Sequence, residues 1–300
     1  MANVCIIGNG LVSLTLAKAL VNQEIFVDLL GNLDNKKIDK SRTIGISKMN
    51  TDFFNEEILN INKLLWEINK IEIYSDNLNN QKILNFENNK KKLFSIVKNF
   101  ELYKLLTLSL KKNIFFKYKK NFKINNYDLI INCDKESFLS KKYFYKKLNK
   151  NYKSYAHTTI LDHKKLSKNN IATQIFTKKG PLAFLPISNT KTSVVYSCRG
   201  SKEIDLENII KKYNKKYSIT KIHNISSFKL SSTNLRDYHY QNILAFGDLL
   251  HKLHPLAGQG FNMTIRDIKT LLDLIKFKLE HGLELNSSIC VDFQKKTKHK

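Results

Sequence analysis

The first thirty residues constrain the fold more than any other stretch of the chain. Residues 2–7 (ANVCII) have the composition of a short buried strand, and the turn Gly8-Asn9-Gly10 follows directly. An apolar helix then extends to about residue 21, and residues 25–30 form a second strand. This order makes a βαβ unit, so we expect an α/β domain built on a Rossmann-like sheet.

The turn of this unit has the spacing of a dinucleotide-binding fingerprint. Gly8 permits the tight turn, and Gly10 lets a pyrophosphate approach the backbone where Leu11 and Val12 begin the helix. Ser13 replaces the third glycine, which is a small change. The alternative is an ordinary glycine turn of a doubly wound protein, because this fingerprint is weak by itself.

The acidic residue that would hold a ribose about 20 residues further on is missing. Gly31 stands where the second strand ends, and neither Asp28 nor Asp34 lies at the expected position.

A second unusual stretch is GDLLHKLHPLAGQGFNMTIRD, residues 247–267. It follows a buried strand at 242–246, and Asp248 is placed to accept hydrogen bonds from ribose hydroxyls at the end of that strand. Residues 254–260 are expected to form a turn and residues 261–280 a helix. The amides at the start of this helix suit a delocalised anion, such as the pyrimidine side of a reduced flavin. The alternative is an ordinary glycine-rich loop between a strand and a helix.

These motifs resemble the ubiquinone-biosynthesis hydroxylases, which are 2-polyprenyl-phenol hydroxylases within the class A FAD-dependent monooxygenases. The resemblance includes IIGNGLVSLTLAKAL near the N-terminus, RTIGIS (42–47), IEIYSD (71–76), FTKKGPLAFLP (176–186) and, most specifically, residues 247–267.

The resemblance implies an α/β fold of two domains, like that of para-hydroxybenzoate hydroxylase. A Rossmann-like FAD-binding domain would comprise residues 1–70, 95–136 and 238–300. A mixed, mostly antiparallel β-sheet domain that binds substrate would comprise residues 71–94 and 150–237.

The resemblance also implies the chemistry. FAD would be reduced by NADH or NADPH and react with O₂, and a flavin hydroperoxide would then hydroxylate a polyprenyl phenol of ubiquinone synthesis. No residue is assigned a certain catalytic role; His251, His254 and Pro255 are expected to lie beside the flavin. The expected cofactor-binding residues are Gly8, Gly10, Leu11, Val12, Arg42, Asp134, Gly247, Asp248, Pro255, Gly258, Gln259, Gly260, Phe261 and Asn262.

The chain departs from the family in three places. Lys135 replaces the glycine that follows Asp134 in the second fingerprint, and the segment 110–128 is shorter than the family's usual β-meander. The sequence also ends soon after the last FAD-domain helix, which indicates a shortened chain or a fragment. These departures leave open a degenerate flavoprotein with a non-catalytic role in a quinone-synthesis assembly.

The net charge of +25 would ordinarily suggest a nucleic-acid or anionic-membrane partner. Only four of the 51 basic residues are arginines, however, and the lysines are scattered, as AT-rich codon usage would produce. We therefore expect no nucleic-acid partner, and association with a membrane or a quinone-synthesis complex stays open. Four cysteines without CxxC spacing favour a cytoplasmic protein with no metal site, and peripheral binding to the inner face of the membrane is the alternative location.

Overall fold

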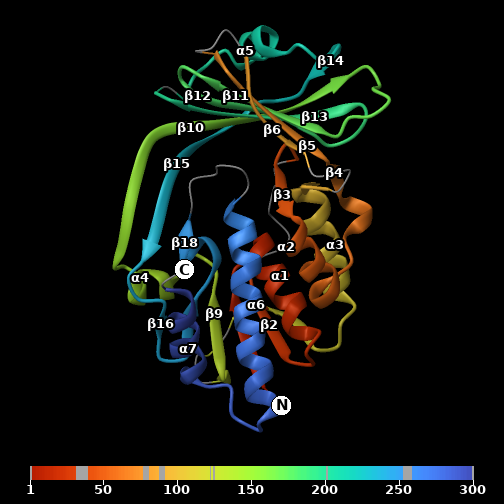
Figure 1. Cartoon of the computed structure of the whole chain (residues 1–300). Coiled ribbons are helices and arrows are strands. Elements are labelled where there is room, and N and C mark those ends of the chain that lie inside the picture. The colour runs from red at the N-terminus through yellow and green to blue at the C-terminus, as the bar shows by residue number, and fades with distance from the viewer. Residues whose placement is uncertain are drawn as a thin grey trace.

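The computed structural model describes residues 2–31, 40–76, 81–87, 92–121, 123, 126–200, 202–252 and 259–298. Within these ranges the chain forms two main layers, a lower domain around a parallel sheet and an upper domain formed by a large sheet (Figure 1). The helices are α1 Leu11–Val21, α2 Lys48–Phe53, α3 Asn99–Lys111, α4 Phe138–Tyr143, α5 Leu206–Tyr213, α6 Gln259–Glu280 and α7 Ser287–Thr297. None of the helices in these ranges is both long and apolar enough to cross a bilayer.

The lower domain contains a six-stranded sheet of order β16-β17-β9-β1-β2-β8, counted over the described residues. Strands β1 (NVCII) and β9 (LIIN) are almost entirely apolar, as expected where helices and loops cover both faces of a parallel sheet. All pairs are parallel except the β16–β17 hairpin. The strands are β1 Asn3–Ile7, β2 Phe26–Leu30, β8 Phe116–Lys119, β9 Leu129–Asn132, β16 His239–Tyr240 and β17 Ile243–Ala245.

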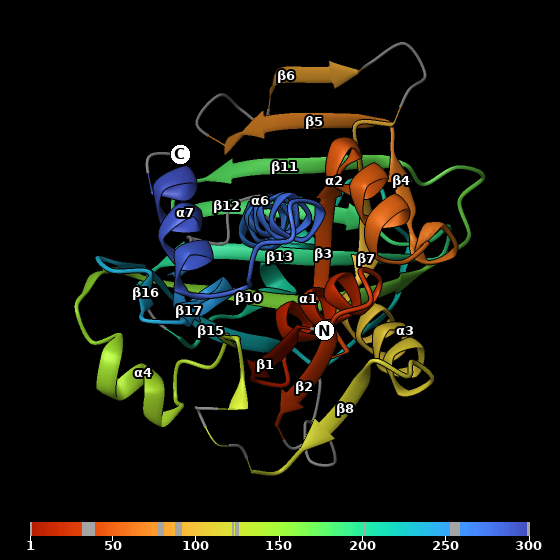
Figure 2. The ribbon, with the colours of Figure 1, turned by 90° about the horizontal axis from the view of Figure 1, so that it is seen from below.

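The upper domain contains a nine-stranded sheet whose main path is β18-β15-β10-β13-β12-β11-β5-β6, with β14 paired to β10. Only the β11–β5 pair is parallel, which matches the mixed, mostly antiparallel sheet expected from the sequence. Figure 2 shows these strands side by side from below, with α6 of the lower domain seen end-on in front of them. The strands are β5 Lys70–Ser75, β6 Gln81–Glu87, β10 Lys147–His163, β11 Ile171–Thr177, β12 Gly180–Pro186, β13 Lys191–Arg199, β14 Ile219–Ile222, β15 Ser226–Leu235 and β18 His251–Lys252.

A small sheet of β3 (Thr43–Ser47), β7 (Phe94–Lys98) and β4 (Trp66–Ile68) lies between the two domains. Ile68 and Ile96 of this sheet are fully buried against the inner face of the large sheet. The outer face of the large sheet is covered by α5, whose Leu206 and Ile210 are also fully buried.

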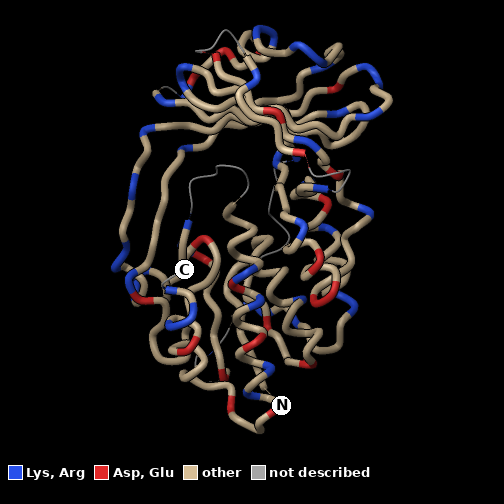
Figure 3. Tube along the Cα trace, in the orientation of Figure 1, with Lys and Arg blue, Asp and Glu red and all other residues tan. Residues whose placement is uncertain are grey.

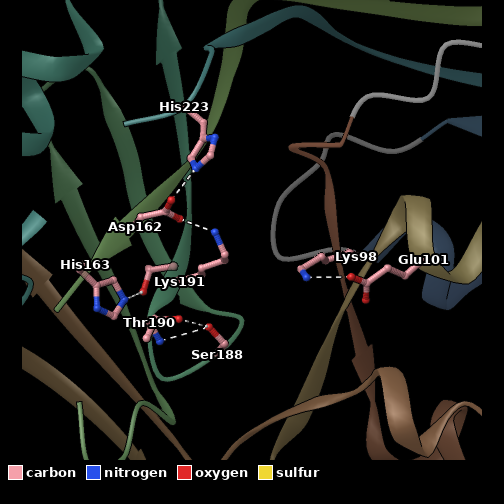
Figure 4. Close-up of polar contacts among 9 residues, drawn as sticks. Lys98, Glu101, Asp162, His163, Ser188, Thr190, Lys191 and His223 are labelled. Carbon is pink, nitrogen blue, oxygen red and sulfur yellow. Dashed lines mark hydrogen bonds and ion pairs between the residues drawn. The ribbon is translucent and has the colours of Figure 1, made fainter. Parts of the chain in front are cut away.

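Strand β10, with 17 residues, is the longest strand among the described residues. Its first half, residues 147–151, pairs with β15 and extends down from the large sheet as an arm (Figure 1). At the opposite end of β10 from the arm, Asp162 accepts hydrogen bonds from Lys191 (2.6 Å) and His223 (2.9 Å). These bonds tie β13 and the segment after β14 to β10 (Figure 4). Burial acts to raise the pKa of Asp162, but these two partners outweigh it and hold the pKa below its ordinary value.

Candidate cofactor site

The strand order of the lower sheet places a topological switch point between β1 and β9. The chain leaves β1 toward β2 on one side, and it later returns to add β9 and β17 on the other side. In open α/β sheets, ligands bind at the carboxyl ends of the strands at such a point. The residues that follow β1, β9 and β17 are therefore the candidate site, and they include both glycine motifs found in the sequence.

The turn after β1 is tightly built. Gly8 has φ +121°, which disfavours any other residue, and its amide donates to the carbonyl oxygen of Leu30 (2.9 Å). A Cβ added at Gly8 would lie 3.0 Å from Ser13 Oγ and 3.6 Å from Asp134 Cβ. The first turn thus directly contacts the residues that follow β9, as the switch point requires.

Helix α1 begins at this turn without a side-chain cap. Gly10 is its N-cap in an extended conformation, no side chain accepts from the first amides, and the first turn holds no acidic residue. The first amides of a helix have no intrahelical acceptor, and together they form the positive end of the helix dipole. This end of α1, at Leu11 and Val12, is suited to an anionic group such as a phosphate.

Cys133 marks where the three strand ends meet. Burial raises the pKa of its thiol to about 12, a hydrogen bond with Ser13 opposes the rise, and the nearby carboxylates of Asp248 and Asp134 add to it. The thiol is therefore neutral and serves as packing. Its neighbours show that Asp134 and Asp248, from separate motifs, both lie close to the start of α1.

The two carboxylates differ in how they are engaged. Asp134 Oδ1 accepts from the amide of Glu136 (2.9 Å), which shapes the turn after β9. Asp248 is exposed, and it makes no hydrogen bond or ion pair with any residue that the structure describes. The side chain of Lys135 is 69% exposed and lies 4.0 Å from Glu136, so it does not fill the space at the end of β9.

Gly247 brings the second motif against the first. It has φ +62°, and a Cβ there would lie 2.7 Å from Val12 Cγ1, so the fold requires glycine at this position. On the other side of β1, a Cβ at Gly31 would lie 3.0 Å from Asn9 Cβ. Gly31 is therefore packed beside the first turn.

Asp28 accepts from Tyr127 (2.8 Å) in the middle of β2, away from the strand end, and Asp34 lies outside the described residues.

Asn262 joins two of the sequence motifs. Its side-chain oxygen accepts from the amide of Ser47 (2.9 Å) and from Asn50 Nδ2 (2.7 Å), and its Nδ2 donates to the carbonyl oxygen of Gly45 (2.7 Å). The side chain expected to bind cofactor is thus committed to holding β3 and α2 against the first turn of α6. The sequence alone did not indicate this role.

His251 and Asp267 form a buried pair at the two ends of the second motif. His251 Nε2 lies 2.7 Å from Asp267 Oδ2, and the two side chains are 7% and 9% exposed. The pair connects β18 to α6 across residues 253–258. The sequence placed His251 beside the flavin. Arg266 is exposed and makes no ion pair within the described ranges, whereas its neighbour Asp267 makes the buried contact.

The remaining predicted residues are distributed as follows. Gln259 and Gly260 begin α6, and a Cβ at Gly260 would meet no atom within 4 Å among the described residues outside its own helix. Phe261 is partly buried near Phe54. Arg42 is exposed, with its guanidinium 5.5 Å from the ring of Phe228 on β15. His254, Pro255 and Gly258 lie outside the described residues.

The inner face of the large sheet supplies a surface that the sequence motifs did not identify. Thr158, Val195, Ala183 and Gln174 lie directly opposite one another across β10, β13, β12 and β11. The segment before β3 reaches this face, since Ser41 contacts Thr158 (3.4 Å) and Thr43 donates to Ser193 (3.1 Å). Val195, Ala183 and Gln174 are only partly buried. Only the register of the strands could reveal that these four side chains are aligned.

Comparison with known proteins is consistent with this geometry. Residues 149–281 match the family described as "FAD binding domain". The chain is similar to the mitochondrial ubiquinone biosynthesis monooxygenase COQ6 of Rattus norvegicus, with 26% identity over 180 residues, or 46% of this chain and 38% of that protein. It is also similar to the 3-demethoxyubiquinol 3-hydroxylase of Escherichia coli K12, with 30% identity over 118 residues, or 36% of this chain and 30% of the relative. The matches thus span less than two fifths of either relative.

Solved structures share the fold over nearly the whole chain. PqsL, a probable FAD-dependent monooxygenase from Pseudomonas aeruginosa, superposes with a TM-score of 0.76 at 14% identity, covering 98% of this chain and 91% of PqsL. The p-nitrophenol 4-monooxygenase PnpA of Pseudomonas putida DLL-E4 gives a TM-score of 0.77 at 11% identity, covering 98% and 85%.

The chain therefore has the two-domain α/β fold of the FAD-dependent monooxygenases, as its sequence predicted. Within that class, the chain is similar to ubiquinone-biosynthesis monooxygenases, which is the family that its motifs resemble.

Proposed function

We propose that the protein is an FAD-dependent monooxygenase that hydroxylates the ring of a polyprenyl phenol with NADH or NADPH as reductant. The observation that carries the proposal is the meeting of three strand ends at an uncapped helix start, beside the carboxylate of Asp248, which has no partner among the described residues. The relatives named above support the reaction class, and their names connect it with ubiquinone synthesis.

The residues at the switch point suit the ADP half of FAD. The amides of Leu11 and Val12 would bind the pyrophosphate, and Gly10 would let it approach. Gly10 has φ −83° and ψ 174°, a conformation open to most residues, so the backbone itself does not require glycine there. Asp248, whose carboxylate has no partner among the described residues, would accept from the ribose hydroxyls; Gly8, Asp134 and Gly247 would shape the turn around it.

The start of α6 suits the flavin half. No acidic residue lies in the first turn of this helix, so its positive end stays available for the anionic edge of the ring. The open space at Gly260 would allow a ring to approach the backbone, and Gln259 offers a donor and an acceptor. Pro255 and Gly258, and His254 beside the flavin, belong to the same proposal.

When bound, the flavin supplies the redox and oxygen-transfer chemistry, and the protein contributes position, exclusion of water and electrostatics. The row Thr158, Val195, Ala183 and Gln174 would form the surface on which the phenol lies. His251 and Asp267 would hold β18 and α6 so that the intervening segment keeps its place. Arg42 and Asn262 would fix β3 and the segment before it between the two domains.

The test begins with flavin binding. Purified protein supplied with FAD should retain flavin absorbance, and NADH or NADPH should bleach it in the absence of oxygen. Gly10→Val should lose the flavin, while Gly10→Ala loses less of it. Both should keep the far-UV circular dichroism of the wild type, because their backbone conformation is allowed. Full flavin retention by Gly10→Val would contradict the proposed binding site.

The substrate is tested separately by mass spectrometry. A polyprenyl phenol incubated with the holoprotein, reductant and O₂ should gain one oxygen atom. Reduction of the flavin without any gain in substrate mass would instead support the degenerate, non-catalytic flavoprotein.

A further inference from the structure

One end of the large sheet carries apolar side chains on the face that points to the lower domain. The row that contains Gln174 continues onto β5 and β6, because Gln174 lies opposite Ile73 and Ile73 lies opposite Leu84. Side chains that lie opposite one another on neighbouring strands project from the same face of a sheet. Phe86 and Phe176 stand two residues further along β6 and β11, so they project from this face as well. We call Ile73, Leu84, Phe86 and Phe176 the apolar strip.

The apolar strip is open to solvent although it holds no polar side chain. Leu84, Phe86 and Phe176 are 50%, 48% and 43% exposed, and Ile73 is only partly buried. Nearer the small sheet, the same face is closed, because Ile68 and Ile96 pack against it. Adjoining exposed apolar side chains mark a surface that another apolar group covers.

The charged residues of β5 and β6 lie on the opposite face. There, Glu72 accepts a hydrogen bond from Lys82 (2.7 Å), and Lys70 lies 3.4 Å from Glu72 and 3.6 Å from Glu87. Strands β11 and β12 contain no charged residue. Figure 3 shows long uncharged stretches along the strands of the large sheet, with basic residues mostly in the loops around it. In a chain with 51 basic residues, the strip therefore offers a neutral surface, which suits an uncharged occupant.

A second copy of the chain, adding its own strand to β6, is the main alternative occupant. The register between β5 and β6 shifts after Ile73, and Ile83 is left without a partner on β5. Such irregularities bend and twist an edge strand, and they oppose pairing with another strand. The edge of β6 is thus less suited to a second copy than its apolar face is to a flexible hydrocarbon.

We infer that the apolar strip binds the prenyl tail of the phenol, while the ring lies on the row of Thr158, Val195, Ala183 and Gln174. The inference rests on the proposed function, and it adds where the tail lies and what length of tail the protein binds. Three strand spacings separate Ala183 on β12 from Leu84 on β6, which corresponds to about 14 Å. An isoprene unit adds four bonds to the length of the tail, so roughly three extended units cover this distance.

The experiment is equilibrium dialysis of the oxidised, FAD-loaded protein against phenols that carry from none to four isoprene units. No reductant is added, so binding is measured without turnover. The affinity should rise by on the order of tenfold with each unit up to the third, because each unit removes apolar surface from water. The fourth unit should add little, since it would extend past the edge of β6.

Variants on the two faces of β6 locate the tail. Leu84→Gln should weaken binding of the three-unit phenol by roughly five- to tenfold and leave binding of the unprenylated phenol unchanged. Lys82→Gln changes the opposite face of the same strand, and Ile114→Gln removes an apolar side chain of the lower domain that is 80% exposed. Both control variants should keep the full gain from the prenyl units.

The outcomes separate this inference from the proposed function. Failure of every phenol to bind would refute the proposed function, and the inference with it. Binding that does not increase with prenyl units, or an increase that Leu84→Gln leaves intact, would overturn the inference alone. Sedimentation velocity tests the alternative occupant: a wild-type dimer that Leu84→Gln dissociates would assign the apolar strip to a second copy and overturn the inference.

Discussion

The buried pair of His251 and Asp267 allows a quantitative test of how the site is held. The two side chains are less than a tenth exposed and 2.7 Å apart. His251→Leu would leave a buried carboxylate without its partner, and we expect this to reduce the free energy of unfolding by about 3 kcal/mol. Asp267→Leu should cost about 2 kcal/mol, because an imidazole is less costly to leave unpaired than a carboxylate.

The stability of the double variant shows whether His251 and Asp267 stabilise the protein as an interacting pair or independently of each other. Replacing both partners of a buried polar pair with apolar side chains is often close to neutral. The double variant should therefore be more stable than the sum of the single losses predicts, by at least about 1 kcal/mol. Urea denaturation of the flavin-free protein measures all three variants. Asp273→Leu, on an exposed position of the same helix, is the control and should change stability by less than about 0.5 kcal/mol.

Flavin affinity gives the second readout of this pair. His251 and Asp267 stand on either side of residues 253–258, which the sequence places beside the flavin. If the pair positions this segment, the double variant should bind FAD at least about tenfold more weakly, equal to roughly 1.4 kcal/mol, even where its stability has recovered. Strictly additive single losses would refute the reasoning about the pair. Unchanged flavin affinity in the double variant would refute its positioning role.

Three further predictions follow from the described geometry. Gly247→Ala should reduce the free energy of unfolding by about 2 kcal/mol, because φ is +62° and the new Cβ approaches Val12; Val12→Ala in the same chain should restore part of the loss in denaturation experiments. Asn262→Ala removes the hydrogen bonds to the segment around Ser47, and a loss of about 2–4 kcal/mol should appear as a lower Tm. Asp162 has a pKa held below its ordinary value, so its carboxylate adds stability above about pH 4 that is lost as the pH falls through the depressed pKa. Asp162→Asn should thus cost about 1 kcal/mol at neutral pH, and its deficit should vanish in acid if denaturation is followed against pH.

The sequence predicted the elements of the site better than the contacts between them. Strands β1, β2 and β17 and helices α1 and α6 were recognisable because apolar periodicity and glycine turns are local signals. The first half of β10 was missed, since residues 147–155 hold lysine and asparagine and lack the pattern of a buried strand. This part is a strand because it pairs with β15, whose position in the chain is more than seventy residues away.

Contacts between motifs depend on how separate elements are aligned, and local patterns do not contain that information. Asp267 and Arg266 are neighbours in the sequence and both are charged, yet one helical position separates a buried partner of His251 from an exposed side chain. A rotation of about 100° per residue along α6 decides which of them faces β18. In the same way, Asn262 belonged to a motif expected to bind cofactor, and only the packing of β3 and α2 shows what its amide holds.

Some glycines of the site are required by the fold itself, and others would be required only by a bound ligand. Gly8 and Gly247 have positive φ, so other residues would be strained there whether or not a ligand binds. Gly10 has an extended conformation open to most residues, and Gly260 is helical with no atom of the other described residues near its missing Cβ. Alanine favours a helix over glycine by up to about 1 kcal/mol, so Gly260 lowers the stability of α6 without relieving any contact within the described protein. Gly260→Ala should therefore stabilise the flavin-free protein and weaken its binding of FAD. Denaturation measures the stability, and flavin titration measures the affinity for FAD. A gain in stability with a loss of affinity is expected of a glycine retained for a ligand. If stability and affinity instead changed in the same direction, Gly260 would serve the fold alone.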